Sequence, residues 1–496
     1  MLEMTKKIEN RQRIRRSVDE INAAIHAMAH PRAIAIVGAT RTRPDGFPGM
    51  FACIRNFGFP GTLYPVNPKA DEIDGIKAYP SLTALPEPVD LVIISLPGHK
   101  VPDVLRDCIK SGNKNIHIFS SGFNETGEIE GIRLYEEMKN IADENGLNVV
   151  GPNCMGFYVP ESRLLTWPKA AEKSGPLAFI SQSGGHAQDF TNYAANKLGI
   201  YASKVISYGN ALTLDSPDFL EYLAQDQKTG IIAMYLEGVK NGRRLMRLAV
   251  EINRKKPILI MKAGLTKSGA RTVASHTGSM AGGEKIWKAF FRQTGTIQTD
   301  SLEQMAEVAV ALDYLPRWTG KNVVILGTGG CVGVEAADSC AKTALHLSAL
   351  SPGLLKRLRE HIPPAGNMIR NPIDAHILLL DLKRLGPVLE LLAKETSVDL
   401  FLISLHFDWL QDKGDGAHAE QIGAYIAEEA RKHIGGKPLA AAWRQYQPTP
   451  KIEATRQIVE KTLIQARIPV YNGLQRALTA LSKAEAYYAF QEKEKQ

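Results

Sequence analysis

Short apolar runs rich in β-branched residues recur along the chain, and stretches with helical spacing separate them. In the N-terminal part these runs are Ala33–Val37, Thr62–Val66, Val89–Ile94, Ile116–Phe119 and Asn148–Val150. Apolar strands that alternate with helices predict a parallel, doubly wound sheet with helices on both faces. We expect this first domain at residues 31–160, after an N-terminal helix within residues 1–30 that extends from about Lys6 to Met28.

The order of strand, glycine-rich turn and helix begins twice more. Leu177–Ile180 precedes the turn 181–185, and Asn322–Leu326 precedes the turn 327–330. Further apolar runs are Ser203–Ser207, Ile231–Leu236, Ile258–Lys262, Leu400–Ser404 and Leu439–Ala442. The pattern therefore predicts an α/β fold with three doubly wound parallel-sheet domains, the second at residues 170–315 and the third at residues 320–490.

Composition excludes several classes of protein. The chain has 496 residues, and none of its apolar runs approaches the ~18–20 residues that a membrane span requires. No apolar core follows the basic N-terminal stretch, so a signal peptide is not expected. We predict a cytoplasmic protein with no membrane partner. The five cysteines are scattered without metal-site spacing, so no metal ligands are predicted.

The formal net charge is +8, and the basic residues are spread out and little interleaved with aromatic residues. This distribution argues against a nucleic-acid partner. A mild positive excess suits anionic small molecules such as phosphorylated cofactors, although a solvated surface that aids solubility explains it equally well.

The turn after the first strand departs from the dinucleotide-binding pattern. Gly38 is followed by Ala39, Thr40 and Arg41 without a GxGxxG motif, and no acid ends the second strand before Lys69. Both absences argue against NAD. A ligand with phosphates can still lie near Thr40, Arg41 and Lys69; the alternative is a turn that binds nothing.

Two segments of the second domain suggest phosphate chemistry. Ser183, Gly184 and Gly185 enter a helix, where free N–H groups and the positive helix end favour an anion, although packing alone also explains such a turn. His276 lies in a run of small and hydroxyl residues that leaves its ring approachable, as a phosphate-carrying nucleophile requires. Glu237, at a strand end, is a candidate to hold the second ring nitrogen; the alternative is a solvated loop acid.

A family resemblance rests on eight segments in this order: AIVGAT, YPVNPK, GPNCMG, AFISQSGG, YLEGVKNG, SHTGSMAG, GTGG and NPID. The chain resembles the α subunits of ADP-forming acetyl-CoA synthetases and, more distantly, that of succinyl-CoA synthetase. The resemblance implies a CoA-binding Rossmann domain followed by two flavodoxin-like ligase domains. It also implies an enzyme that interconverts acyl-CoA, phosphate and ADP with acid, CoA and ATP through an acyl phosphate and phosphorylated His276.

The resemblance also implies roles for individual residues. His276 corresponds to the phosphorylated histidine, and Glu237 corresponds to the acid that holds it. The expected CoA contacts are Gly38, Ala39, Thr40, Arg41, Lys69, Phe119, Ser120 and Ser121. The expected phosphate and acyl contacts are Asn153, Ser183, Gly184, Gly185, His186, Gln188 and Gly278. His186 and Gln188 replace the small apolar residues of acetate-type enzymes, so we expect a polar, aromatic or carboxylated acid; the alternative is that they only cap the helix and lie at the surface.

The nucleotide site is expected on another chain. Nothing in the sequence resembles an ATP-grasp domain, and no P-loop replaces one. The resemblance therefore implies a hetero-oligomer with an ATP-grasp β subunit, two copies of each, which would hold ATP or ADP with Mg. The alternatives are a CoA-binding regulatory or CoA-transfer protein without nucleotide chemistry, an NAD-dependent oxidoreductase, and a serine hydrolase that uses Ser183.

Overall fold

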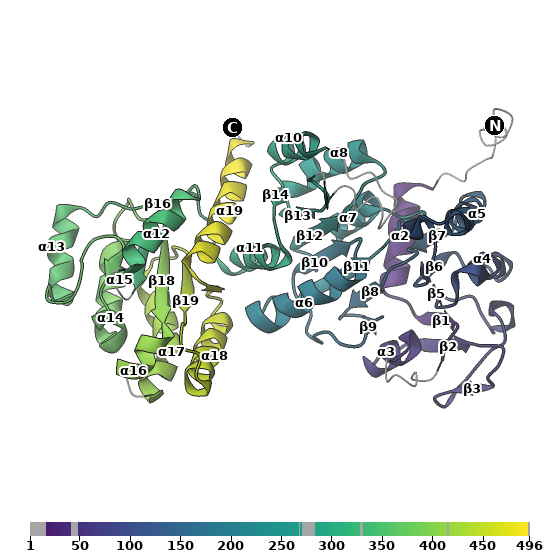
Figure 1. Ribbon diagram of the computed structural model, residues 1–496, viewed down its shortest axis with the longest axis horizontal. Helices are drawn as coiled ribbons and strands as arrows, with labels where there is room; N and C mark the ends of the chain where they lie inside the picture. Colours follow the sequence, from purple (N-terminus) through teal and green to yellow (C-terminus); the bar gives the residue numbers. More distant parts are fainter. Residues whose placement is uncertain are drawn as a thin grey trace. The chain divides into compact units, whose positions relative to one another are not determined.

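A computed structural model of the chain describes residues 16–40, 48–266, 268–269, 283–327, 331–413 and 416–494. The chain divides into two compact units (Figure 1). The first unit comprises residues 1–195 and 201–302, and the second comprises residues 196–200 and 303–496. Of the predicted site residues, Arg41, His276 and Gly278 lie outside the described residues.

The first sheet has the strand order β2-β1-β5-β6-β7, and its pairs are parallel, as predicted. Its strands are β1 (Ala33–Val37), β2 (Thr62–Val66), β5 (Leu91–Ile94), β6 (Asn115–Ile118) and β7 (Asn148–Val150). Helices α3 (Met50–Asn56), α4 (Val101–Lys110) and α5 (Ile129–Asn145) join them, with the hairpin β3 (Glu72–Ile73) and β4 (Ile76–Lys77) after β2. Three short 3₁₀ helices are η1 (Leu82–Ala84), η2 (Gly98–Lys100) and η3 (Asn124–Thr126).

Helix α2 (Val18–Ala29) lies within the range expected for the N-terminal helix, and residues 6–15 of that range lie outside the described residues. Ser17 caps it: the Ser17 hydroxyl accepts a hydrogen bond from the Glu20 N–H, and the Glu20 carboxylate accepts one from the Ser17 N–H. These two reciprocal hydrogen bonds form a capping box. They satisfy N–H groups that have no hydrogen-bond partner within the helix, and they fix its first turn.

The second sheet has the strand order β14-β13-β12-β10-β11-β8-β9. Its central strands are β10 (Leu177–Ser181), β11 (Ala202–Ser207), β12 (Ile231–Leu236) and β13 (Ile258–Lys262), and β14 (Ile297–Gln298) lies at one edge. The pairs among β10–β14 are parallel, as predicted, and at the other edge β8 (Gly156–Val159) and β9 (Leu164–Leu165) add antiparallel pairs. Strand β8 lies within the range expected for the first domain, yet it pairs with β11.

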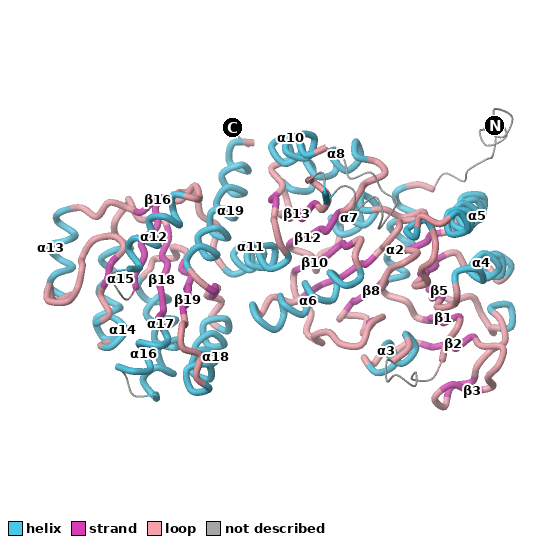
Figure 2. Tube along the Cα trace, in the orientation of Figure 1, coloured by secondary structure: helices cyan, strands magenta, loops and turns pink. Residues whose placement is uncertain are grey.

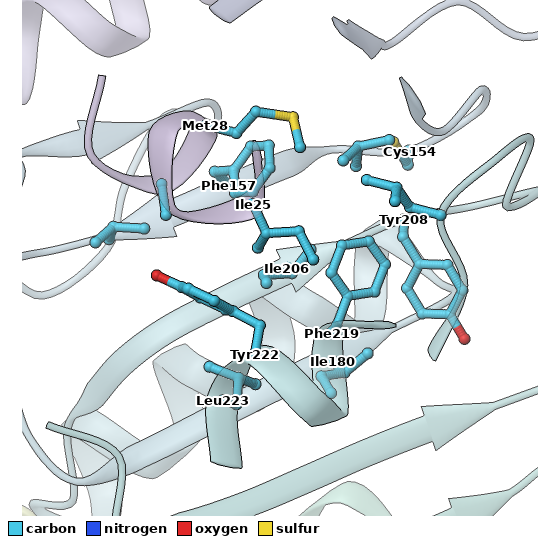
Figure 3. Packing of buried hydrophobic residues seen from close by; sticks show 14 of the residues in the cluster. Ile25, Met28, Cys154, Phe157, Ile180, Ile206, Tyr208, Phe219, Tyr222 and Leu223 are labelled. Carbon is cyan, nitrogen blue, oxygen red and sulfur yellow. The ribbon is translucent and has the colours of Figure 1, made fainter. Parts of the chain in front are cut away.

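Helices α6 (Gly184–Leu198), α7 (Ser216–Gln225), α8 (Gly242–Asn253) and α10 (Glu284–Thr294) accompany the second sheet (Figure 2). One hydrophobic core cluster extends from α2 and the first sheet into the second sheet. Figure 3 shows Ile25 and Met28 of α2 in this cluster with Phe157, Ile206 and Tyr222. Because both sheets contribute to this close-packed core, the core restrains their positions relative to one another.

The second unit contains the third sheet, in the order β16-β15-β18-β19-β20, with β17 paired to β15. Its strands are β15 (Asn322–Gly327), β16 (His346–Leu347), β17 (Ile373–Asp374), β18 (Leu400–His406), β19 (Leu439–Arg444) and β20 (Val470–Asn472). Its helices are α11 (Leu302–Tyr314), α12 (Cys331–Ala341), α13 (Pro352–His361), α14 (Ile377–Leu380), α15 (Leu385–Ala393), α16 (Phe407–Lys413), α17 (Gly416–His433), α18 (Pro450–Gln465) and α19 (Leu474–Lys493), with the 3₁₀ helix η4 (Leu382–Arg384). The pairs are parallel, as predicted.

Candidate active site

A cavity of about 710 Å³ lies in the first unit, where loops of the first sheet meet the start of α6. Ligands of open α/β sheets bind outside the carboxyl ends of the strands, and this cavity occupies such a place. Loops after β1, β5 and β6 line it together with the segment after β7 and the start of α6. The lining includes Gly38, Thr40, Ser95, Leu96, Phe119, Ser120, Ser121, Asn153, Met155, Gln182, Ser183, Gly184 and Gly185.

Gly38 brings the loop after β1 against the loop after β5. Its φ is +86°, and a Cβ added there would lie 2.3 Å from the Ser95 carbonyl oxygen and 2.8 Å from a Leu96 methyl carbon. Only glycine fits such a conformation and such an approach. The Ser120 hydroxyl joins the neighbouring loop, because it donates to the Leu96 carbonyl at 2.5 Å and accepts from the Leu96 N–H at 3.3 Å. Backbone groups of the loops after β1, β5 and β6 therefore form one wall of the cavity.

Asn153 provides the next part of the wall. It has a left-handed φ of +57°, and its N–H donates to the Ser120 carbonyl at 2.9 Å. Asparagine adopts this conformation more readily than most residues. Its side-chain amide donates to Asn210 Oδ1 at 3.4 Å, and Asn210 Nδ2 in turn donates to Glu125 Oε2 at 2.6 Å. These bonds fix the Asn153 amide at the cavity.

The first turn of α6 closes the cavity on the side of the second sheet. The Ser183 hydroxyl accepts from the His186 N–H at 3.3 Å, which caps the helix, and Gly184 and Gly185 follow it. A Cβ on Gly184 would lie 2.5 Å from Met155 Cγ, so glycine lets the helix start approach the segment after β7. Backbone N–H groups and the positive end of a 15-residue helix therefore face the cavity, where they favour an anion.

Glu237 lies buried beside this helix start, at the end of β12. Gln182, which lines the cavity, accepts from the Glu237 N–H at 2.5 Å and from the Gly238 N–H at 2.9 Å. The Tyr235 hydroxyl donates to Glu237 Oε1 at 3.3 Å. Gln182 therefore fixes the backbone of the Glu237 loop, while Tyr235 contacts its carboxylate.

Lys262, the last residue of β13, lies buried next to the Glu237 backbone. Its ammonium donates to the Glu237 carbonyl oxygen at 2.8 Å and to the Ala263 carbonyl oxygen, and it lies 5.4 Å from the centre of the Trp287 ring. Burial lowers the pKa of the Lys262 ammonium to about 8, although the Glu237 charge opposes that shift. The ammonium joins the ends of β12 and β13 to α10.

Comparisons with known proteins agree on the family. A family model described as a CoA binding domain matches residues 32–160, and one described as a succinyl-CoA ligase like flavodoxin domain matches residues 174–312. The ADP-forming acetate–CoA ligase I of Archaeoglobus fulgidus is 38% identical over 76% of this chain and 54% of that enzyme. The α subunit of acetate–CoA ligase I from Pyrococcus furiosus is 38% identical over 71% of this chain and 76% of that subunit.

A solved structure agrees over almost the whole chain. The acetyl-coenzyme A synthetase 1 of Ca. Korarchaeum cryptofilum, in complex with phosphate and ADP, is 30% identical with a TM-score of 0.80. The match covers 95% of this chain and 98% of that chain.

The chain belongs to the ADP-forming acetate–CoA ligase family. It spans about half the length of the A. fulgidus ligase, of which it covers 54%, and about three quarters of the P. furiosus α subunit, of which it covers 76%. The expected fold, with a CoA-binding domain and succinyl-CoA-ligase-like flavodoxin domains, is confirmed for this member of the ligase family.

In this ligase fold, many of the residues predicted from the sequence meet at one cavity. Predicted CoA contacts and predicted phosphate or acyl contacts both line it: Gly38, Thr40, Phe119, Ser120, Ser121, Asn153, Ser183, Gly184 and Gly185. Segments far apart in the sequence therefore converge on one space.

Other predicted residues lie outside the cavity lining that the described residues form. Ala39 is buried, and its carbonyl accepts from Asn67 Nδ2 at 3.0 Å. Lys69 is exposed, Glu237 is buried behind Gln182, and His186 and Gln188 are half-buried on α6. Sequence reasoning assigned no role to Ser95, Gln182 or Tyr235. The position of Ser95 at the end of an apolar strand is a signal that could have identified it.

The described residues contain no group of three or more His, Cys, Asp and Glu side chains that could hold a metal ion. They also contain no helix that is both long and apolar enough to cross a membrane.

Proposed function

We propose that the chain is the α-type subunit of an acyl-CoA synthetase that forms a nucleoside diphosphate. The complete enzyme interconverts acyl-CoA, phosphate and ADP with a carboxylic acid, CoA and ATP. The observation that supports this best is the shared cavity, where strand-end loops of the CoA-binding domain meet the anion-binding start of α6. A CoA thioester bound by the loops would have its reacting carbonyl next to N–H groups that can hold phosphate.

The loops after β1, β5 and β6 are suited to hold CoA. The approach of Gly38 to Ser95, which only glycine allows, brings the loops after β1 and β5 together into one wall of the cavity. Thr40, Ser120 and Ser121 place hydroxyl groups along the same wall. CoA supplies the thiol that carries the acyl group, and these residues position it.

The N–H groups of Ser183, Gly184 and Gly185 then hold phosphate while its oxygen attacks the thioester carbonyl. The C–S bond breaks, CoA leaves as the thiol, and the acyl phosphate remains at the helix start. An anion that gains charge in the transition state is stabilised by N–H groups whose positions are fixed in advance.

We place His276 as the nucleophile that accepts the phosphoryl group. One nitrogen of the neutral imidazole attacks phosphorus, the P–O bond to the acyl group breaks, and the acid leaves as a carboxylate. Glu237 accepts a hydrogen bond from the other ring nitrogen, which fixes the tautomer and stabilises the cationic phosphohistidine. In the synthetic direction, phosphorylated His276 gives its phosphoryl group to the acid, and CoA then displaces phosphate.

A partner subunit of the ATP-grasp type completes the cycle in this proposal. It holds ATP or ADP with Mg and exchanges the phosphoryl group with His276, in an assembly with two copies of each subunit. The P. furiosus relative is named an α subunit, which supports a partner for this chain as well.

Labelling of His276 tests the proposed function. The chain, together with an ATP-grasp partner and [γ-³²P]ATP, is expected to acquire an acid-labile, base-stable phosphate. His276→Asn is expected to abolish the label and turnover, whereas His346→Asn, a control at an exposed histidine, keeps both. Glu237→Gln is expected to reduce labelling and leave CoA binding intact. Calorimetry on the isolated chain should show binding of CoA and no comparable binding of NAD. Turnover by the His276→Asn enzyme contradicts the proposal.

A further inference from the structure

Tyr235 lies between two predicted site residues. Its ring stacks on the His186 ring with centroids 4.4 Å apart and planes 12° from parallel. Its hydroxyl donates to Glu237 Oε1 at 3.3 Å. His186 Nδ1 lies 2.8 Å from the Ser183 hydroxyl. A continuous line of contacts therefore runs from the start of α6, through His186 and Tyr235, to the Glu237 carboxylate.

The local structure explains why these groups meet. Tyr235 and Glu237 are two residues apart at the end of β12, so their side chains point to the same face of the sheet. Ser181 of β10 is the register partner of Tyr235, and α6 begins three residues after Ser181. The first turn of α6 therefore passes over the Tyr235 ring, where His186 covers it.

We infer that Tyr235 is a positioning residue for the proposed phosphoryl transfer: its hydroxyl orients the Glu237 carboxylate, and the stacked His186 ring orients Tyr235. The inference rests on the proposed function, in which Glu237 holds His276 during phosphoryl transfer. It assigns to His186 a supporting role beneath the cavity in place of contact with the acyl group.

The chemistry of the three groups suits this role. A glutamate side chain has several rotatable bonds, and a hydroxyl donor restricts the orientation of its carboxylate. Burial and the Glu237 charge raise the pKa of the Tyr235 phenol, so the phenol keeps the proton that it donates. The phenol ring is itself held by the parallel stack with His186.

The same contacts join the two groups that the reaction uses together. Ser183 belongs to the helix start that is proposed to hold the phosphoryl oxygens, and Glu237 is proposed to hold the attacking histidine. Because His186 contacts Ser183 and Tyr235 contacts Glu237, a movement of either group displaces the other. His186 and Tyr235, which lie outside the cavity lining, therefore help Gln182 to fix the distance between the phosphate site and the acid.

Tyr235→Phe in the complete enzyme, with its partner, tests this inference. The variant keeps the stacked ring and loses the hydroxyl. We expect the rate of His276 labelling and kcat to fall about tenfold, which corresponds to about 1.4 kcal/mol, while KM for CoA and CoA binding stay within about twofold. The matched control is Tyr222→Phe, which removes a buried tyrosine hydroxyl that contacts His26 Nδ1 at 3.2 Å. The control is expected to label at the wild-type rate.

A double-mutant cycle separates a positioning role from a general structural one. His186→Ala removes the stack and is expected to slow labelling to a similar extent. If His186 acts through the Tyr235 hydroxyl, His186→Ala adds little in the Tyr235→Phe background, so the two losses are not additive. If Tyr235→Phe also loses CoA binding, that loss indicates misfolding. The rate of His276 labelling in His186→Ala then tests the positioning role in its place.

The outcomes distinguish the two proposals. A wild-type enzyme that acquires no phosphate on His276 contradicts the proposed function and removes the basis of this inference. A labelled wild type with Tyr235→Phe labelled equally fast overturns the positioning role alone. Additive losses in the double mutant show that His186 and Tyr235 act separately and overturn the role given to His186.

Discussion

Single backbone positions set the shape of the cavity. Gly38 has a positive φ and lies against the Ser95 carbonyl, and Asn153 has a positive φ and bonds to the Ser120 carbonyl. Each brings the ends of strands together by a conformation that most residues avoid. Changes at these positions therefore act on the wall of the cavity as well as on stability.

Gly38→Ala is expected to destabilise the protein by about 2–4 kcal/mol, since it adds a close contact with a backbone oxygen to the cost of a positive φ. Gly75→Ala is the matched control, because Gly75 has a φ of +83° with nothing within 4 Å of an added Cβ. Urea unfolding should show a clearly larger loss for Gly38→Ala, with weaker CoA binding by calorimetry. Equal losses at the two glycines contradict the close contact.

His117 makes stability depend on pH. It is fully buried on β6, its Nε2 lies 3.3 Å from the Cys154 carbonyl oxygen, and its Nδ1 has no hydrogen-bond partner among the described residues. Burial lowers the pKa of the His117 imidazole to about 4 from an ordinary value of 6.5. The neutral ring therefore favours the folded state above pH 6.5, and this contribution is lost as the pH falls towards 4.

The loss expected from His117 between pH 7.5 and pH 5 is about 2 kcal/mol of unfolding free energy. Urea unfolding at the two pH values measures it. His117→Gln should be less stable at pH 7.5 but should lose less between the two pH values than the wild type does. His99→Gln, at an exposed histidine, should retain the wild-type dependence. An unchanged dependence in His117→Gln argues that other groups cause it.

At the scale of elements, a buried ion pair ties β11 to the segment after α7. The Lys204 side chain is 1% exposed, and its ammonium lies 2.9 Å from the Asp226 carboxylate. Asp226 also accepts from the Thr229 hydroxyl at 2.6 Å, and these contacts lower the pKa of the Asp226 carboxyl although burial opposes them. A buried charge without its partner is costly.

Lys204→Met is expected to destabilise the protein by about 3–5 kcal/mol, because it leaves the Asp226 charge without its buried cation. Adding Asp226→Asn should recover part of that loss. Lys110→Met, at an exposed pair with Asp107, should change stability by less than about 0.5 kcal/mol. The three variants can be compared by thermal unfolding. A double variant no more stable than Lys204→Met contradicts the buried-charge explanation.

Strands with strong apolar periodicity were predictable from the sequence. The observed bounds of β1, β2, β7, β12 and β13 coincide with the predicted runs. Strands β8, β9, β14, β16, β17 and β20 were not predicted, because such short runs carry little hydrophobic periodicity. The site shows the same division: strand-end glycines and serines were predictable, whereas Tyr235 inside an apolar run gave no signal of its contact with Glu237.

At the scale of the whole molecule, the chain divides into two units, and the cavity belongs to one of them. The residues that line the described cavity belong to the first unit, which comprises residues 1–195 and 201–302. The second unit carries a further sheet of related topology with its own apolar core. The formal net charge of +8 provides an attractive field for anions such as CoA and phosphate, so their rates of association should fall as salt rises.

The close approach of Gly184 to Met155 couples two positions of the cavity lining. A side chain larger than hydrogen at position 184 meets Met155 Cγ at 2.5 Å, and both residues line the cavity. Position 184 can therefore enlarge only if position 155 shrinks or shifts, so the two positions change as a pair. Under the proposed function, selection for a new acid should recover substitutions at Met155 first, since they alter the cavity while leaving the start of α6 in place.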